Sequence, residues 1–407
     1  MTPIAEGVGA LGRHLAAHVG WWRPRPFALG VDVPWAHDHP EAARWLASLD
    51  HARIDHIEGQ GALPDDAPGD LVALERATRA LVEAAVPGAS EHEPASDRPA
   101  ERFADHAARR EAAYVPGRKR AQIEGLAARV VPRGPIVDWC GGKGHLGRTL
   151  GARHGVPVIV IEREAAYADE ARALADRLGV HLDLVPIDAL APEAERHLGP
   201  GVWAVGLHAC GALGVRLLEA GARRGVAALA LAPCCLHKDT WRPLSEVGRA
   251  LDPGLDHSAL RLATSDEVVA PPRLRAARRR ENAWRLGLDL LLREASGRDA
   301  YTPLGTLPAE LLRAPFEVFC REAALLRGLA LPAAWDPVAM EREAHARALA
   351  ARALGLARGL FRRALELFVT LDRARFLEER GYAVDVTTFC ARSATPRNLV
   401  IRALAPA

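Results

Sequence analysis

The sequence predicts an α/β protein built around a mainly parallel sheet, and two features of the chain indicate it. Between residues 120 and 235, short apolar segments alternate with segments of helical composition, as in βαβ units. These apolar segments do not alternate regularly with polar residues, which is typical of strands buried on both faces. Two strand-like segments follow a long helical stretch, so we expect the sheet to resume near the end of the chain.

The individual elements follow from this pattern in chain order. Five strands are expected at residues 135–140, 156–161, 181–187, 202–207 and 226–232, and two more at 382–389 and 399–404. Helices between the first five strands are expected at 146–153, 165–178, 192–198 and 212–223. Residues 340–380 are rich in strong helix formers, and Gly381 lies where a helix would end.

Composition divides the chain into four expected segments. Residues 1–100 would form an N-terminal helical region that ends in a polar, proline-rich linker at 86–103. Residues 101–239 would hold strands one to five, and residues 370–407 would complete the sheet with strands six and seven. Residues 240–369 would form a helical insertion between strands five and six.

Charge and cysteine content exclude several classes of protein. The 407 residues include 53 basic and 51 acidic side chains, a net charge of +2. This excludes a globally basic protein that coats nucleic acid, but it allows a local basic patch. Six cysteines in a chain of this length are not a disulfide framework. With no signal peptide or apolar membrane anchor in the sequence, we expect a cytoplasmic protein without a membrane partner.

A glycine-rich turn between the first strand and the first helix is the clearest candidate for a ligand site. Residues 135–146 end a strand and open a helix, and Gly142 and Gly144 would let the backbone approach a ligand near unpaired N–H groups. Glu162 follows the second strand, where an acid can bind ribose hydroxyls. Asp188 follows the third strand. The alternatives are a tight turn without a ligand and ordinary solvated acids.

These residues resemble a known family. Asp138-x-Cys140-x-Gly142-x-Gly144 resembles the first motif of class I S-adenosylmethionine-dependent methyltransferases, although Cys140 stands where the common dinucleotide pattern has its first glycine. Residues 115–238 and 370–405 also resemble a narrower methyltransferase-domain family. The segments that carry this resemblance are Lys143–Leu146 (KGHL), Leu207–Gly211 (LHACG) and Pro233–Lys238 (PCCLHK). The resemblance implies a Rossmann-like sheet of seven strands, in which an antiparallel seventh strand inserts beside the fifth.

The resemblance also implies a cofactor and roles for the residues at the strand ends. S-adenosyl-L-methionine would be held by Asp138, Cys140, Gly142, Gly144, Glu162, Asp188 and His208. Glu162 would bind the ribose hydroxyls, and Asp188 would face the adenine amino group. Gly142 and Gly144 would give the methionine moiety access to the backbone, while Asp138 would support the loop.

Catalytic candidates follow strands four and five. His208, Cys234 and His237 are the residue types that can accept a proton or contact a substrate. A structural histidine and packed thiols are the alternative interpretations. Cys210, Cys234, Cys235 and the two histidines are also metal-ligand types, but we expect no metal because the side chains of adjacent cysteines usually diverge.

Polar residues outside the cofactor motifs are candidates for binding a methyl acceptor. They are Lys119, Lys238, Arg397 and Asn398, together with Arg278 and Arg279 on one face of a helix that could meet phosphates. The alternative for that face is an ordinary solvated one. RNA is the acceptor class that we favour, ahead of a protein or a small molecule. A non-catalytic module that binds the cofactor or RNA is the rival interpretation, and the sequence determines neither the acceptor atom nor the oligomeric state.

Overall fold

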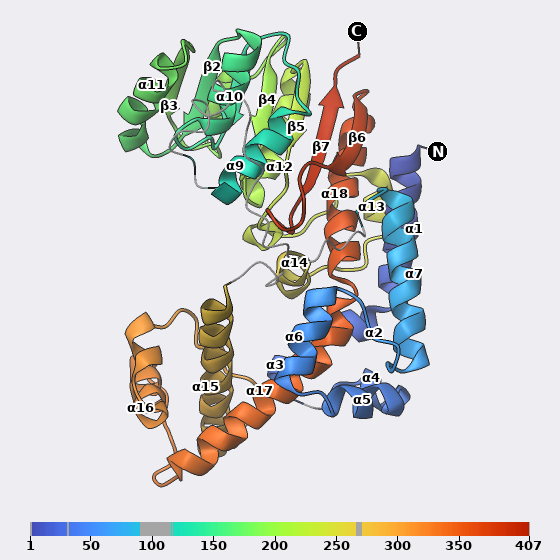
Figure 1. Cartoon of the computed structure of the whole chain (residues 1–407), viewed down its shortest axis with the longest axis vertical. Coiled ribbons are helices and arrows are strands. Elements are labelled where there is room, and N and C mark those ends of the chain that lie inside the picture. Colours follow the sequence, from blue (N-terminus) through green and yellow to red (C-terminus); the bar gives the residue numbers. More distant parts are fainter. Residues whose placement is uncertain (1, 31, 90–114, 116, 266–270, 407) are drawn as a thin grey trace. The chain divides into compact units, whose positions relative to one another are not determined.

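The computed structural model describes residues 2–30, 32–89, 115, 117–265 and 271–406 of the chain (Figure 1). The chain forms two compact units. The first contains Met1–Ala17, Ala77–Val269 and Phe361–Ala407, and the second contains His18–Arg76 and Ala270–Leu360. The linker predicted at 86–103 lies mostly outside the described residues, and the four predicted segment boundaries remain a prediction.

The first unit is built on a sheet of seven strands. Its order is β3-β2-β1-β4-β5-β7-β6, with the bounds β1 Ile136–Trp139, β2 Val158–Glu162, β3 Leu182–Pro186, β4 Trp203–Gly206, β5 Ala228–Leu231, β6 Ala383–Thr388 and β7 Leu399–Leu404. The first five strands are parallel, and β7 runs antiparallel to both β5 and β6. Each strand lies where the sequence predicted one, and the order and directions confirm the predicted class I methyltransferase fold.

Side chains along each strand point alternately to the two faces of the sheet. Helices cover both of these faces. On β1, Asp138 faces α10 (His145–His154), where it accepts a hydrogen bond from the Gly147 N–H. The next residue, Trp139, points to the other face and donates from Nε1 to the Leu213 carbonyl of α12 (Ala212–Arg224). Both faces of β1 are therefore buried, which explains why Ile136, Val137 and Trp139 are apolar.

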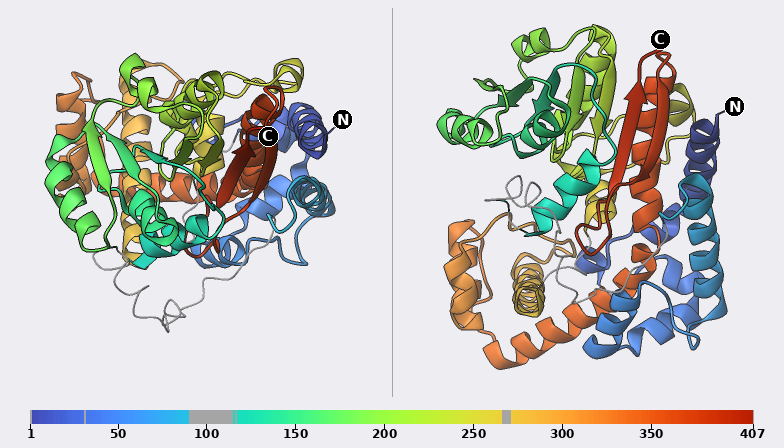
Figure 2. Two further views of the ribbon diagram at one scale, coloured as in Figure 1. Left: turned by 90° about the horizontal axis from the view of Figure 1, so that it is seen from above. Right: turned by 45° about the horizontal axis from the view of Figure 1, so that its top comes forward.

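The last two strands form a hairpin that closes the sheet, drawn in red in both views of Figure 2. Its inner strand β7 pairs with β5 from Ala228 opposite Leu404 to Leu231 opposite Ile401. The Tyr382 hydroxyl, just before β6, donates to the Val226 carbonyl before β5 at 3.0 Å. The carboxyl-terminal segment is thus tied to the strands that come before the helical stretch.

The first unit contains further helices. They are α1 Pro3–Ala17, α9 Gly117–Ala127, η1 Ala165–Tyr167, α11 Ala168–Asp176, η2 Pro192–His197, η3 Leu236–Lys238, α13 Glu246–Ala250, α14 His257–Thr264 and α18 Arg362–Glu378, while α7 Gly69–Ala85 runs from the second unit into the first. The helix predicted at 192–198 is a 3₁₀ turn. The helical stretch predicted at 340–380 is two helices, since the chain leaves helical hydrogen bonding at Leu360 and Phe361.

The second unit is helical and has its own core. Its helices are α2 Val19–Trp22, α3 Pro26–Leu29, α4 Trp35–Asp38, α5 Pro40–Ala47, α6 His51–Gln60, α15 Pro272–Ser296, η4 Ala309–Arg313, α16 Phe316–Leu326 and α17 Pro337–Gly359. Trp284 of α15 packs against Phe316 and Phe319 of α16 in this core. Among the described residues, we find no helix that combines the length and the apolarity needed to cross a membrane.

Candidate active site

The glycine-rich loop after β1 has an open side and a tightly packed side. Cys140, Gly142 and Gly144 all have positive φ angles, of 58°, 60° and 67°. A Cβ atom added at Gly144 would lie 2.9 Å from Val160 Cγ2, so a side chain does not fit there. A Cβ atom added at Gly142 would meet no atom of the described residues within 4 Å. Gly142 therefore presents bare backbone to open space.

Two acids hold this loop in place. The Asp138 carboxylate is only 1% exposed and accepts the Gly147 N–H at 2.8 Å; its burial is the main cause that raises its pKa to about 6. Glu162, at the end of β2, accepts the N–H groups of Gly142 and Glu164, both at 3.0 Å. A carboxylate has about four acceptor positions, so Glu162 keeps capacity for a ligand's hydroxyl groups.

Cys140 lies where the ends of several strands meet. Burial is the main cause that raises the pKa of its thiol to about 12, and the nearby charges of Glu162, Asp138, Cys210 and Asp188 add to that effect. Asp188 also accepts the Leu190 N–H at 2.9 Å, which fixes the turn after β3. The structure thus brings together the acids and the cysteine that the sequence assigned to the cofactor site.

His208 stands at the end of β4 with a strained backbone. Its φ angle is 92°, a conformation that costs a non-glycine residue about 1–2 kcal/mol. The residue is exposed, yet desolvation by surrounding atoms, followed by the nearby Lys119 charge, lowers its pKa. His208 is therefore a neutral imidazole at neutral pH, on the same edge of the sheet as the glycine-rich loop.

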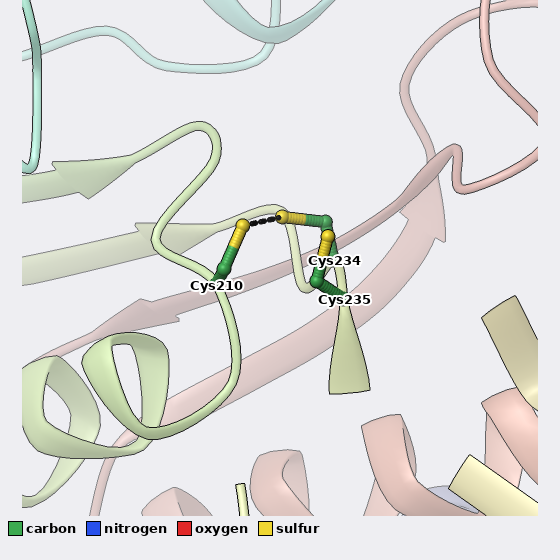
Figure 3. A group of neighbouring side chains, drawn as sticks. All are labelled: Cys210, Cys234 and Cys235. Atoms are coloured by element: carbon green, nitrogen blue, oxygen red, sulfur yellow. Dashed lines mark hydrogen bonds between the residues drawn. The ribbon is translucent and has the colours of Figure 1, made fainter. Parts of the chain in front are cut away.

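The loops after β4 and β5 bring three thiols together (Figure 3). The Cys210 and Cys234 sulfur atoms lie 3.1 Å apart, and the two residues form an isolated parallel β-bridge. Cys235 has a φ angle of 42°, so its side chain joins the other two. Hydrogen bonding with Cys234, with smaller contributions from the Lys238 and Arg397 charges, lowers the pKa of Cys235 to about 5. Hydrogen bonds with Cys210 and Cys235 raise the pKa of Cys234.

The side chain of His237 contacts a neighbouring helix. Its Nδ1 atom lies 3.1 Å from the Thr264 hydroxyl at the end of α14, and its ring lies edge-on to His257. Arg397 donates to the Thr264 carbonyl at 3.0 Å, while Lys238 is exposed. His237 is thus held against α14, whereas His208 faces solvent at the sheet edge.

Asn398, which the sequence predicted to bind the acceptor, is buried and links two segments of the first unit by hydrogen bonds. It is 4% exposed. Its Oδ1 atom accepts from Arg363 Nη2 and its Nδ2 atom donates to the Cys390 carbonyl, both at 2.8 Å. These contacts join the loop between β6 and β7 to α18, and they give Asn398 a structural role that the sequence did not reveal.

Lys119 lies near Asp138 and the glycine-rich loop. Its pKa is lowered chiefly by desolvation, while the Asp138 carboxylate acts in the opposite direction and Lys143 and Arg148 lower it further. All of these neighbours belong to β1, the glycine-rich loop or α10. Lys143 itself is paired with Glu170 at 2.7 Å on α11.

Arg148 is a buried cation that no sequence pattern singled out. It is 1% exposed, and its Nη2 atom lies 2.8 Å from His145 Nδ1. Its Nε and Nη1 atoms have no hydrogen-bond partner among the described residues. Burial lowers the pKa of both residues, that of His145 to about 4. This part of α10 therefore carries positive charge with free donor groups close to the glycine-rich loop.

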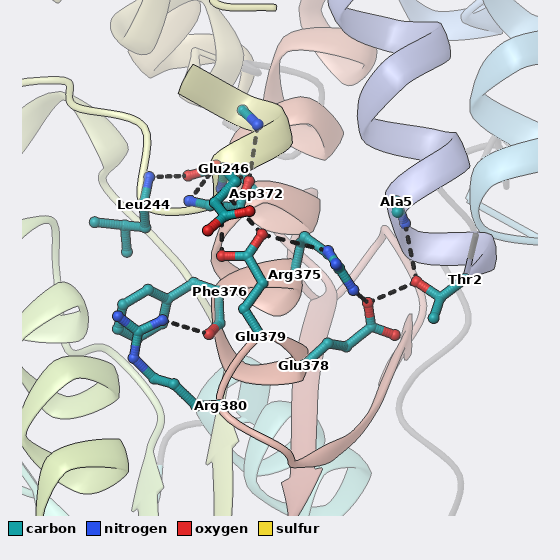
Figure 4. Close-up of polar contacts among 12 residues, drawn as sticks. Thr2, Ala5, Leu244, Glu246, Asp372, Arg375, Phe376, Glu378, Glu379 and Arg380 are labelled. Carbon is teal, nitrogen blue, oxygen red and sulfur yellow. Dashed lines mark hydrogen bonds and ion pairs between the residues drawn. The ribbon is translucent and has the colours of Figure 1, made fainter. Parts of the chain in front are cut away.

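The segment that follows the three thiols is anchored by α18 (Figure 4). Asp372, which is fully buried, accepts the Leu244 N–H at 2.8 Å, the Ser245 N–H at 3.0 Å and the Ser245 hydroxyl at 2.7 Å. The neighbouring Glu379 accepts the Glu246 N–H at 2.9 Å. These bonds cap the start of α13 and fix the chain that leaves the β5 end of the sheet.

The predicted basic face lies on α15 in the second unit. Arg279 donates from Nη1 to both carboxylate oxygens of Asp55 at 3.2 Å, and Asp55 also pairs with Arg352. Arg278 is exposed. Part of the positive charge that the sequence showed on this face is thus balanced within the unit.

Comparison with known proteins points to one family for part of the chain. Residues 118–239 match the model of a family described as a methyltransferase domain. A SAM-dependent methyltransferase from Geobacter sulfurreducens, crystallised with S-adenosyl-L-homocysteine, is 21% identical over 30% of this chain and 52% of its own, with a TM-score of 0.23. YjhP from E. coli is 14% identical over 55% of this chain and 94% of its own, with a TM-score of 0.25.

The chain thus spans about half the length of the Geobacter structure that it matches. No curated protein matches the chain. The match of residues 118–239 covers strands β1 to β5, and the strand order of the complete sheet is the one that class I methyltransferases have. The segment that carries the glycine-rich loop and the thiols is thus similar in sequence to a methyltransferase domain.

Proposed function

We propose that the protein is an S-adenosyl-L-methionine-dependent methyltransferase. The observation that carries the proposal is the bare backbone of Gly142, which has a positive φ angle and open space beside it, next to the Glu162 carboxylate at the end of β2. Such a cradle fits a nucleoside with an attached amino-acid moiety at the carboxyl ends of parallel strands. When bound, the cofactor supplies an electrophilic methyl group on a sulfonium.

The residues at the strand ends suit this cofactor in charge and hydrogen-bonding capacity. Glu162 keeps acceptor positions for the two ribose hydroxyls, and Asp188 can accept from the adenine amino group. Lys119 and the free N–H donors of Arg148 supply positive charge beside the glycine-rich loop. That charge suits the carboxylate of the methionine moiety.

His208 is the residue that we propose as general base. Its lowered pKa keeps the imidazole neutral at neutral pH, so that it can accept a proton from a hydroxyl or amine as the nucleophile attacks. Cys234 is buried with a raised pKa, and His237 is engaged with Thr264. These two predicted catalytic residues therefore have less capacity to move a proton.

For the acceptor we propose RNA. Arg273, Arg278 and Arg280 are exposed on α15, and clustered arginines bind phosphates. The experiment changes Arg273 and Arg278 to glutamate together, which leaves the Arg279–Asp55 pair intact. RNA binding, measured by fluorescence anisotropy across salt concentrations, should weaken, and the salt slope should fall by about 0.7 for each phosphate that the variant no longer neutralises. The matched control changes Arg298 and Arg342, two exposed arginines of the same unit, to glutamate.

Methyl transfer itself is tested with cofactor that carries a labelled methyl group. Purified protein is incubated with this cofactor and cell extract, and the products are treated with ribonuclease or with protease. Label that ribonuclease releases supports an RNA acceptor, and label that protease releases would replace RNA by protein. Cofactor binding by calorimetry without any transfer would favour a non-catalytic module and overturn the proposal.

A further inference from the structure

The thiols of Cys210, Cys234 and Cys235 lie at the edge of the proposed active site and have no part in the proposed reaction. Their sulfur atoms all lie within 4.8 Å of one another (Figure 3). The chain has three other cysteines, Cys140, Cys320 and Cys390, and among the described residues this is the one group of cysteines that converges in this way. Free thiols that only fill space in a protein have no reason to gather in a group of three.

The backbone around the thiols is built to hold them in place. The Gly211 N–H donates to the Cys234 carbonyl at 3.3 Å, next to the β-bridge between Cys210 and Cys234. Gly211 has a φ angle of 54°, and a Cβ atom there would lie 2.5 Å from the carbonyl carbon of Lys238. The loops after β4 and β5 are thus in direct contact, and only glycine allows that contact.

Cys235 contributes the third sulfur through a strained conformation. Side chains of adjacent residues diverge in an extended chain, which was the reason to expect no metal here. At Cys235 the backbone is not extended: its φ angle of 42° turns the side chain towards Cys234. The divergence of adjacent side chains therefore does not argue against a metal at this position. This left-handed conformation is unfavourable for a residue with a side chain, and strain of this kind clusters at functional sites. A disulfide between Cys210 and Cys234 would not need the third thiol.

We propose that Cys210, Cys234 and Cys235 bind a single thiophilic d¹⁰ metal ion, Zn²⁺ or Cu⁺, through three thiolates. Soft sulfur ligands select these ions. Bonds of about 2.3 Å from a common centre place tetrahedral sulfur ligands about 3.8 Å apart, which lies within the 4.8 Å that contains all three sulfur atoms here. The Cys210–Cys234 pair, at 3.1 Å, opens by about 0.7 Å to reach that geometry.

The charges around the cluster suit a site made of thiolates. Lys238 and Arg397 act on Cys235, and the buried Arg373 interacts with Cys234. These cations offset the net negative charge that three thiolates leave on a mono- or divalent ion. Binding displaces a proton from each thiol that is still protonated. Three protein ligands leave a fourth position open, as in catalytic rather than structural zinc sites.

The test uses the full chain, reduced and freed of metal, and does not depend on methyl transfer. Co²⁺ is titrated in as a spectroscopic probe and then displaced by Zn²⁺; a second arm titrates Cu⁺ against a chelator of known affinity. We expect one equivalent, with an intense sulfur-to-cobalt charge-transfer band. Cys235→Ser should weaken binding at least about 100-fold, because even the loss of a group that only orients a ligand costs about 10–100-fold. Cys390→Ser, which changes a cysteine of similar burial outside the cluster, should bind like the wild type.

Cys235 is only partly buried, so its serine variant should fold, and circular dichroism checks this. The proposal is overturned if the reduced protein shows no thiolate charge-transfer band, or if the folded Cys235→Ser variant binds as tightly as the wild type. It is also overturned if the protein as purified carries no metal and has Cys210 and Cys234 joined in a disulfide on mass spectrometry. Failure of cofactor binding in the separate calorimetric test would leave this result unaffected.

Discussion

Changing Gly142 to arginine should abolish cofactor binding and leave the fold intact. Gly142 has a φ angle of 60°, and a Cβ atom there would meet no other described atom within 4 Å. The substitution therefore adds no clash, and its cost is the left-handed backbone of a non-glycine residue, about 1–2 kcal/mol. The long arginine side chain would fill the space that the methionine moiety of the cofactor needs.

Gly155 provides a matched control. Its φ angle is 66°, a Cβ atom there would also meet nothing within 4 Å in the described part of the chain, and it lies at the other end of α10, a helix of 10 residues or about 15 Å. Both arginine variants should lose the same free energy of unfolding in urea, while only Gly142→Arg loses binding of S-adenosylmethionine and its demethylated product in calorimetry. Equal binding by the two variants would show that the cofactor does not approach Gly142.

Three further substitutions test the supports of the site. Glu162→Ala should weaken cofactor binding by about 1–3 kcal/mol, the cost of losing charged hydrogen bonds; unchanged affinity in calorimetry would remove Glu162 from the site. The pKa of Asp138 is about 6 in the folded protein, against an ordinary value of 3.8. The folded state therefore holds the proton more tightly, and the free energy of unfolding of the wild type should fall by about 3 kcal/mol as the pH rises from 4 to above 6. Asp138→Asn cannot titrate, so urea unfolding should show a gain over wild type that grows across this window and is constant above it; a constant difference from pH 4 upwards would contradict the assignment. Asp372→Ala leaves two buried N–H groups without an acceptor, those of Leu244 and Ser245, and should cost about 2–6 kcal/mol; a loss below about 1 kcal/mol would mean that water replaces the carboxylate.

The strands could be predicted because burial on both faces leaves a direct trace in the sequence. Ile136–Trp139 is buried at every position, and such a segment is typically a continuous apolar run. The helix break at Leu360 and Phe361 left no comparable trace. Both residues are compatible with a helix, but α17 ends at Gly359, a weak helix former.

Side-chain roles were predictable only where position in the fold determines them. Glu162 and Asp188 follow strands, and parallel strands bring such residues to one edge of a sheet. Asn398 and Arg148 depend on contacts between residues that local sequence does not reveal, such as Arg363 with Asn398. The sequence showed Asn398 as a polar group but not that the core would surround it. Likewise, Arg148 within a helix of mixed composition carried no sign of its burial.

Backbone strain connects the two proposals for this site. Among the described residues, Cys140, His208 and Cys235 are the non-glycine residues with positive φ angles, and they follow β1, β4 and β5 at the same edge of the sheet. Each conformation costs about 1–2 kcal/mol that a glycine would avoid. The chain has glycine at Gly142, Gly144 and Gly211 in the same loops, where positive φ angles also occur. A thiol or an imidazole at the three strained positions is therefore present at the expense of stability, which is what a role for these side chains in binding or chemistry requires.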